Sequence, residues 1–262
     1  MASVDKRVIA GLADQLYQAG QLKVSIDPIS LDNPGLTIED AYAIQLRNIA
    51  RELDQGARVS GKKIGLTSEA MQSLLGVSEP DYGHLLDNMQ VTAGVIDVST
   101  MLQPRVEAEI AFVLSDNLVG PGLTVVDVLA ATDYVVASLE IVDSRIRDWQ
   151  IKLLDTVADN ASSGRYVLGN VKIKPNQIDM IAEQMTLYKN GEVVGTGSGS
   201  AVLGDPAYCV AWLANKLSDF GVTLNRGEVV LSGALSAMVE AFSGDSFRAD
   251  FFRLGSVSVS FI

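Results

Sequence analysis

The chain has 262 residues, a formal net charge of −12, and 48% hydrophobic and 6% aromatic residues. This composition can bury a substantial core and is unlike that of a disordered protein. The acidic excess argues against binding to nucleic acid or to an anionic membrane, because both require basic patches. The single cysteine, Cys209, excludes an intrachain disulfide and fits a reducing compartment.

The beginning of the sequence has the pattern of an amphipathic helix and lacks the continuous apolar core of a signal peptide. No window approaches the roughly 20 apolar residues of a membrane-spanning helix. We therefore expect a cytoplasmic protein with neither a membrane nor a nucleic-acid partner.

The sequence predicts helices over residues 3–20 and 37–56, the second with Thr37 as N-cap and acidic residues in its first turn. Between them, "DPISLDNPG" has the prolines and turn formers of a loop. From about residue 58 the pattern changes to short apolar segments broken by Gly, Pro and Asp. We predict a helical N-terminal region, 1–57, followed by a β-rich catalytic body, 58–262.

In the body, the apolar and turn patterns predict an α+β fold with a mixed or antiparallel sheet and no regular βαβ array. The Asn190-Gly191 pair is typical of a tight type I′ hairpin turn. In chain order the expected elements are a strand in "PRVEAEIAF" (104–112), a helix in 124–135, a strand in 137–145, a hairpin in 185–195, a helix in 205–221, a strand in 227–235 and a terminal antiparallel pair.

The strand predicted at 104–112 raises a physical question. Alternation places Glu107 and Glu109 on the same face, where two like charges repel each other unless water or a cation relieves them. A third carboxylate, Glu140, lies in another apolar strand, and Glu is rarely buried without a partner. Three such carboxylates suit a hard divalent cation such as Mg²⁺ or Mn²⁺. Spacing alone leaves open an exposed pair beside Arg105.

Other polar residues are less specific. In "SGKKIGLT", one of Lys62 and Lys63 should face inward on a strand and could bind an anion or move a proton, although two solvated lysines are the commoner case. Asp81 is expected in a turn, where Asp usually bonds the backbone. His84, the single histidine, makes a zinc site unfavourable and is interpreted as a bystander. The segment "DTVADNASSG" could be a helix-cap loop or a polar wall around a ligand.

Several motifs taken together resemble one family. They are "GKKIGLT", "PDYG", "QPRVEAEIAF", "EIVDSRIRDW", "DTVADNAS", "VLSGAL" and "GSVSVSF". They occur in the order found in the 2-keto-4-pentenoate hydratases, bacterial enzymes of the meta-cleavage degradation of aromatic compounds that are related to the 4-oxalocrotonate decarboxylases and, more distantly, to fumarylacetoacetate hydrolase. The resemblance covers nearly the whole chain, and the combination is specific although each motif alone is weak.

This resemblance implies a mixed β-roll of the fumarylacetoacetate-hydrolase type with flanking helices and a small helical N-terminal region. It implies homo-oligomers and a Mg²⁺ or Mn²⁺ cofactor. It also implies roles for individual residues, namely Glu107, Glu109 and Glu140 as metal ligands, Lys63 and Asp81 as catalytic residues, and Ser162 as a substrate-binding residue. We predict that Asp159, in the same polar segment, and Ser232 also bind the substrate.

The implied activity is metal-dependent hydration of 2-hydroxypenta-2,4-dienoate, or a close analogue, to 4-hydroxy-2-oxopentanoate. Two alternatives stand beside it, 4-oxalocrotonate decarboxylation and a non-catalytic partner subunit, since hydratases and decarboxylases of these pathways can associate. At the corresponding positions the decarboxylases have segments similar to "HPKIEAEI", "DSRYENF" and "MTGGI", and they carry an apolar residue in place of Asp81. This chain has "QPRVEAEI", "DSRIRDW" and "LSGAL", which favours the hydratase, whereas its "DNASS" is shared with some decarboxylases.

Overall fold

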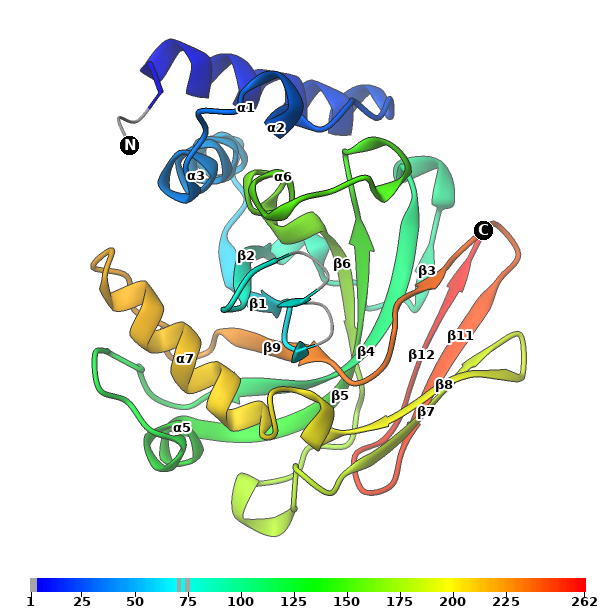
Figure 1. Cartoon of the computed structure of the whole chain (residues 1–262). Helices are drawn as coiled ribbons and strands as arrows, with labels where there is room; N and C mark the ends of the chain where they lie inside the picture. Colours follow the sequence, from blue (N-terminus) through cyan, green and yellow to red (C-terminus); the bar gives the residue numbers. More distant parts are fainter. Residues whose placement is uncertain (1–3, 70–71, 74–75) are drawn as a thin grey trace.

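The computed structural model describes residues 4–69, 72–73 and 76–262 (Figure 1). The helices are α1 (Lys6–Leu22), α2 (Ile29–Asp32), α3 (Ile38–Asp54), α5 (Val125–Ala131), α6 (Leu153–Ala158) and α7 (Pro206–Ser218). The strands are β1 (Val59–Gly65), β2 (Asp81–Leu86), β3 (Val95–Ile96), β4 (Pro104–Leu114), β5 (Thr132–Asp143), β6 (Ser163–Leu168), β7 (Gln184–Lys189), β8 (Glu192–Ser198), β9 (Val229–Ala234), β10 (Val239–Glu240), β11 (Ser246–Phe251) and β12 (Gly255–Phe261).

Two sheets form the body. The larger has the strand order β2-β1-β9-β4-β5-β6, with β10 paired to β4, and the smaller has the order β3-β12-β11-β7-β8. Most pairs are antiparallel, but β1 and β9 run parallel, as do β3 and β12. The sheets are therefore mixed, as the sequence predicted.

The larger sheet curls so that strands from its two ends meet. The Ser60 Oγ on β1 lies 3.1 Å from the Tyr166 hydroxyl on β6, although three strands separate β1 from β6 in the sheet order. Apolar side chains on the concave face form a compact group that we call the floor cluster, which consists of Leu85, Ala111, Val136, Tyr166, Val229 and Leu231. These residues are 0–8% exposed, so the floor cluster closes one part of the concave face.

The N-terminal helices lie over one end of the curled sheet, next to α6, and α5 and α7 lie on the opposite side of the body (Figure 1). Thr37 and Asp40 form a reciprocal capping box that fixes the start of α3. Apolar residues of the helical region, including Leu16 and Ile44, belong to the same buried core cluster as Ile110 of β4. The N-terminal region thus shares its core with the body.

A buried carboxylate also joins the two regions. Asp155 of α6 accepts hydrogen bonds from the Ser30 amide at 2.9 Å and from the Ser30 hydroxyl at 2.8 Å. The boundary between a helical N-terminal region, 1–57, and a catalytic body, 58–262, stays a prediction.

Several local predictions are confirmed. Asn190 and Gly191 have φ values of 54° and 85°, the two positive values that a type I′ turn requires, and β11 and β12 form the expected terminal antiparallel pair. Other local predictions are wrong. The helix expected over 124–135 ends at Ala131, because the following residues pair with β4 as part of β5. The loop between α1 and α3 contains the short helix α2.

A buried polar triad connects α3 with β2 and α6. The Gln45 Nε2 donates to the backbone carbonyls of Tyr82 at 3.2 Å and Val157 at 2.7 Å, which leaves its Oε1 as an acceptor. The His84 Nδ1 lies 2.9 Å from that oxygen and must therefore carry the proton. His84 was expected in a turn, but it lies in β2 and helps to hold α3 against the strand.

Within residues 4–69, 72–73 and 76–262, no helix combines the length and the apolar character needed to cross a membrane.

The burial of His84 should make the folded protein less stable at acidic pH. Burial, and then the nearby positive charge of Lys62, lowers the pKa of His84 to about 3. The unfolded chain binds a proton near pH 6.5 and the folded chain does not, so stability from this group falls as the pH drops below 6.5. Between pH 6.5 and pH 5 the loss should be about 2 kcal/mol.

We expect H84Q, which cannot titrate, to lack this part of the acid destabilisation. Urea unfolding at pH 7 and pH 5 measures it in both proteins, and the carboxylates common to both cancel in the comparison. Identical pH dependence of the free energy of unfolding in the two proteins would contradict the assignment.

Candidate active site

The candidate site lies at one end of the curled sheet, where several strands end together. Strand pairing places Gly65 beside Asp81, Pro104 beside Asp143, and Val142 beside Ser163. We call this end of the concave face the rim. The floor cluster lies further along the same strands, since Ala111 follows Glu109 on β4 and its neighbour Val136 precedes Glu140 on β5, all on the same face.

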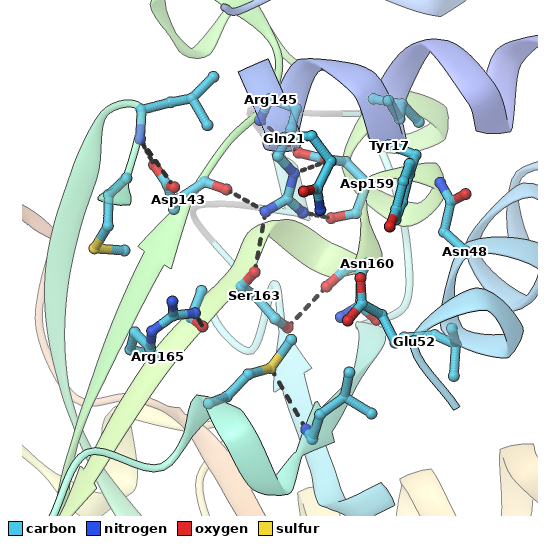
Figure 2. Close-up of a pocket in the computed structure, with 18 of the residues that line it drawn as sticks. Tyr17, Gln21, Asn48, Glu52, Asp143, Arg145, Asp159, Asn160, Ser163 and Arg165 are labelled. Carbon is cyan, nitrogen blue, oxygen red and sulfur yellow. Dashed lines mark hydrogen bonds and ion pairs between the residues drawn. The ribbon is translucent and has the colours of Figure 1, made fainter. Parts of the chain in front are cut away.

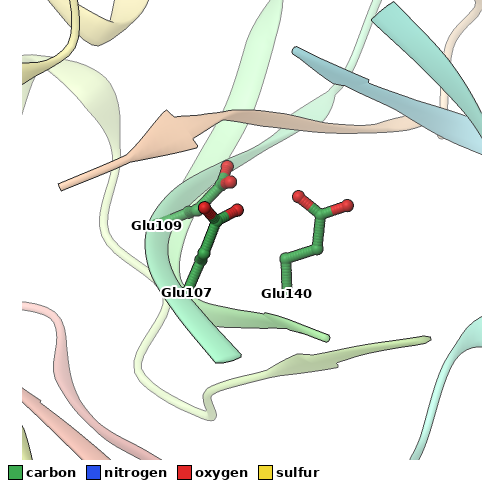
Figure 3. A group of neighbouring side chains, drawn as sticks. All are labelled: Glu107, Glu109 and Glu140. Carbon is green, nitrogen blue, oxygen red and sulfur yellow. The ribbon is translucent and has the colours of Figure 1, made fainter. Parts of the chain in front are cut away.

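Three glutamates converge below the rim (Figure 3). Glu107 and Glu109 leave β4 on one face, and Glu140 lies directly opposite Glu107 on β5. One carboxylate oxygen from each can be chosen so that the three lie within 4.8 Å of one another. Glu109 and Glu140 are buried and Glu107 is half-buried. The sequence prediction that these three carboxylates share one place is confirmed.

Their electrostatics need a cation. Burial, followed by the repulsion of neighbouring carboxylates, raises the pKa of Glu107 and of Glu109. Neither oxygen of Glu140 has a hydrogen-bond partner among the described residues. Such oxygens are costly to bury unless a cation holds them. The three side chains therefore fit a hard divalent cation.

Lys63 faces the glutamates from β1. Its Nζ lies 3.4 Å from the Glu140 Oε2, and its side chain is 5% exposed. Burial lowers the pKa of Lys63, but Glu140, Asp81 and the other glutamates raise it more, so the net shift is upward. The ammonium and the carboxylates thus stabilise one another's charge inside the fold.

Asp81 completes the charged group. It is the first residue of β2 and not a turn residue, because it pairs with Gly65 across the sheet. Its side chain is buried and its Oδ1 has no hydrogen-bond partner within the described chain. Burial raises the pKa of Asp81, while Lys63 and a hydrogen bond from Thr156 act in the opposite direction.

Gly65 makes this approach sterically feasible. A Cβ at this position would lie 2.2 Å from the Asp81 Oδ1 and 3.4 Å from the Lys63 Nζ. Any larger residue would displace one of the two side chains. Gly65 is thus a requirement of the site that the motif "GKKIGLT" contains but that sequence reasoning did not assign.

A bulge in β9 supplies a hydrogen bond to the glutamates. The pairing of β4 with β9 shifts between Glu109 and Ala111, and Gly233 in this bulge has φ 118°. The Gly233 amide donates to the Glu109 Oε2 at 2.7 Å. A φ of this kind is readily adopted only by glycine, so the bulge requires glycine at position 233.

The two adjacent lysines face opposite ways. Lys62 is also buried, at 3% exposure, and pairs with His84 on the outer face of β1 and β2. Burial lowers the pKa of Lys62, and Glu228 partly compensates. The alternative of two solvated lysines is therefore wrong, and one of them does face inward as predicted.

Ser162 lies in a tight left-handed turn before β6. Asn160, Ala161 and Ser162 have φ values of 55°, 50° and 55°, an unusual run for residues other than glycine. Gly83 allows this turn to pack against β2, because a Cβ there would lie 2.4 Å from the Asn160 carbonyl oxygen. The Ser162 Oγ is buried and has no hydrogen-bond partner in the described part of the chain. Such a group is suited to a ligand.

The other two substrate-binding candidates are already bonded within the protein. The Asp159 carboxylate forms an ion pair with Arg145 and also accepts from the Arg145 amide at 2.9 Å. The Ser232 hydroxyl donates to the Ile110 carbonyl at 2.9 Å. Both residues hold segments that border the site, and their direct contact with substrate stays a prediction.

Asp159 and Arg145 line a cavity of about 350 Å³ between the N-terminal helices and the 158–165 segment (Figure 2). Figure 2 shows the Arg145 guanidinium between Asp159, the Asp143 carbonyl and the Ser163 carbonyl. None of the three glutamates, Lys63 or Asp81 lines this cavity. The cavity is thus separate from the glutamate cluster.

Comparison with known proteins agrees with this geometry. The profile of the family described as "Fumarylacetoacetate (FAA) hydrolase C-terminal" matches residues 82–261. A solved structure of 4-oxalocrotonate decarboxylase from Pseudomonas putida G7, complexed with magnesium and adipate, superposes with a TM-score of 0.97 and 36% identity over 100% of both chains.

Curated relatives of similar length are hydratases. A 2-hydroxyhexa-2,4-dienoate hydratase of Comamonas testosteroni is 45% identical over 98% of each chain. A 2-hydroxypent-2,4-dienoate hydratase of Pseudomonas putida is 49% identical over 84% of this chain and 100% of its own. A 2-oxo-hept-4-ene-1,7-dioate hydratase of Escherichia coli is 42% identical over 98% of this chain and 99% of its own.

The fold and the glutamate site thus define a member of the fumarylacetoacetate hydrolase family, and within that family the chain belongs to the 2-keto-4-pentenoate hydratase group.

Gly65 provides a test of the site that leaves every charged group in place. We expect G65A to lower catalytic turnover at least about tenfold, because a displacement of roughly 1 Å from productive geometry costs up to about 100-fold. G11A is the matched control, since a Cβ there meets nothing within 4 Å. Steady-state assays together with thermal melts would separate lost activity from lost folding; equal activity in G65A and G11A would show that the Asp81–Lys63 arrangement is not required.

Proposed function

We propose that the chain is a divalent-metal-dependent hydratase, a carbon–oxygen hydro-lyase. It adds water to 2-hydroxypenta-2,4-dienoate or a close analogue and gives 4-hydroxy-2-oxopentanoate, a reaction of the meta-cleavage degradation of aromatic compounds. The observation that carries this proposal is the convergence of Glu107, Glu109 and Glu140 beside Lys63 and Asp81. The names of relatives 42–49% identical over most of the chain support the same reaction.

In this proposal Mg²⁺ or Mn²⁺ is held by the three glutamates. When bound, the ion supplies positive charge that attracts the carboxylate and the C2 oxygen of the substrate and stabilises negative charge on that oxygen. The related decarboxylase structures were solved with magnesium or with calcium, which supports a divalent ion of this kind. Oxygen ligands alone do not discriminate between Mg²⁺ and Mn²⁺.

Lys63 and Asp81 move protons in the proposed reaction. Protonation of the dienol at C5, with loss of the C2 hydroxyl proton, gives the 2-oxo-3-enoate, whose C4 is electrophilic by conjugation. A water molecule that gives up a proton then adds at C4, and C3 takes up a proton. Lys63 and Asp81 both lie next to Gly65, so they are close enough to share the roles of acid and base, and either assignment satisfies this proton balance.

Ser162 is the substrate-binding residue that the structure supports best, because its buried hydroxyl has no partner within the described chain. Asp159 and Ser232 would act by holding the 145–163 segments and β9 in place, since their polar atoms bond to Arg145 and Ile110.

A second candidate activity is 4-oxalocrotonate decarboxylation, favoured by the TM-score of 0.97 to a decarboxylase. The two reactions would use the same metal-binding glutamates. Following the ultraviolet absorbance of 2-hydroxypenta-2,4-dienoate and of 4-oxalocrotonate in parallel separates them, and the higher catalytic efficiency identifies the function.

We further propose that the chain acts in the cytoplasm as a homo-oligomer and associates with a decarboxylase of the same pathway. These statements rest on the family and on the single cysteine. Light scattering, alone and with the decarboxylase, tests the two assemblies.

Metal removal tests the site directly. After chelation we expect wild-type turnover to fall by at least about 100-fold, because the ion supplies several kcal/mol of charge stabilisation, and to return when Mg²⁺ or Mn²⁺ is added.

E140Q should bind Mn²⁺ at least about tenfold more weakly by calorimetry, since it removes one anionic ligand of three. E192Q, which removes an exposed carboxylate from β8, is the control for a change in charge alone. Unchanged Mn²⁺ affinity in E140Q would remove Glu140 from the metal site.

Replacing Asp81 separates proton transfer from metal binding. We expect D81N to lower hydration about 100-fold or more, the usual contribution of a positioned acid or base, while Mn²⁺ affinity stays within about threefold. Turnover and calorimetry on the same preparation measure both. Full hydratase activity in D81N would remove Asp81 from the mechanism.

A further inference from the structure

Arg105 occupies the rim directly above the glutamates. It is the second residue of β4 and precedes Glu107 by two residues, so strand alternation sends its side chain from the same face as Glu107 and Glu109. Two residues of strand correspond to about 7 Å. The sequence offered Arg105 only as a neutralising neighbour of the two glutamates, whereas its guanidinium pairs with Glu240 on β10.

The floor cluster determines in which direction a bound substrate extends. Ala111, Val136 and Leu231 fill the concave face beyond Glu109, and Tyr166 lies beside Glu140; all four are at most 1% exposed. A dienoate whose carboxylate and C2 oxygen lie at the glutamates, as the proposed function requires, therefore extends from C3 onward toward the rim. Its distal end approaches Arg105.

The Arg105 guanidinium is only partly satisfied. Its Nη2 lies 3.1 Å from the Glu240 Oε1, its Nη1 is 4.0 Å from the Met238 Sδ, and its buried Nε has no hydrogen-bond partner in the described chain. The Cζ lies 4.7 Å from the centre of the Trp149 ring, which orients the plane of the group. The unpaired Nε offers a charge-assisted hydrogen bond to an incoming anion.

The partner that Arg105 already has can be displaced. The Glu240 side chain is 61% exposed, and exposed ion pairs are weak and screened by salt. A guanidinium fixed by an aromatic ring matches a carboxylate through two parallel N–H···O bonds. A carboxylate on the substrate, delivered from the glutamate side, could therefore replace Glu240.

We propose that Arg105 is a specificity-determining residue that binds a carboxylate at the distal end of the dienoate, so that this chain hydrates 2-hydroxy-dienedioates as well as monocarboxylic dienoates. The inference rests on the proposed function and extends it to a substrate class. The alternative is that Arg105 only fastens β4 to β10 and to Trp149.

The test compares two substrates that differ at the distal end, 2-hydroxyhepta-2,4-diene-1,7-dioate and 2-hydroxypenta-2,4-dienoate. We expect R105Q to lower kcat/KM for the dioate about 10–100-fold, mainly through KM, and to leave kcat/KM for the monocarboxylate within about threefold. R105K, which keeps the charge but loses the planar fork, should fall between R105Q and the wild type.

Two further variants control the result. Arg248 on β11 has similar surroundings, since it pairs with Asp250 at 3.0 Å and its Cζ lies 4.8 Å from the centre of the Tyr188 ring. R248Q should therefore leave kcat/KM unchanged for both substrates. E240Q leaves Arg105 intact and removes its competitor, so it should lower KM for the dioate. E240Q keeps the test decisive if R105Q folds poorly in thermal melts.

An equal loss with both substrates in a folded R105Q would show that Arg105 is structural and would overturn the proposal. Unchanged selectivity in both R105Q and E240Q would overturn it as well, as would a wild type that hydrates the monocarboxylate but not the dioate. Wild-type inactivity toward both substrates would instead refute the proposed function itself.

Discussion

The repulsion among three converging carboxylates is the constraint on which the site depends. Glu107, Glu109 and Glu140 bring oxygens within 4.8 Å of one another, and two of the three side chains, Glu109 and Glu140, are buried. Charges interact strongly at low effective dielectric, so this arrangement is stable only with compensating positive charge. Lys63 provides one such charge at 3.4 Å from Glu140, and the geometry of the remaining oxygens favours a divalent ion.

The curled sheet serves this constraint in two ways. Its rim gathers the ends of strands that are distant in sequence, so that β1, β2, β4 and β5 each contribute a charged side chain. Its floor cluster packs the concave face beyond the glutamates and excludes water from that side. A charged site above an apolar floor strengthens electrostatic interactions and gives the substrate a direction.

The helical N-terminal region supports the site from outside. Gln45 bonds to β2 and α6 at once, and α6 leads into the left-handed turn that carries Ser162. The α3 helix therefore helps to position the segments that bear Asp81 and Ser162. This contribution is absent from the sequence motifs, because Gln45 is an ordinary polar residue in an amphipathic helix.

Predictions based on neighbouring residues succeeded where the physics is local. The Asn190-Gly191 turn and the Thr37 cap depend on a few backbone groups, and both have the expected geometry. Predictions that depend on pairing with distant strands failed more often. Asp81 was expected in a turn and lies in β2, and the helix at 124–135 ends early, because pairing with β1 and with β4 decides both positions.

The sequence by itself determined that Glu107 and Glu109 share one face of a strand, because side chains alternate along any extended chain. The apolar pattern around Glu140 also indicated a third carboxylate for the same cation, and the motifs identified the family through which Lys63 and Asp81 were assigned. Tertiary structure decided that these residues meet, that both lysines are buried on opposite faces, and that Asp159 and Ser232 are bonded to Arg145 and Ile110. The order β2-β1-β9-β4-β5 sets these contacts, and it results from the packing of the whole core and not from any single segment.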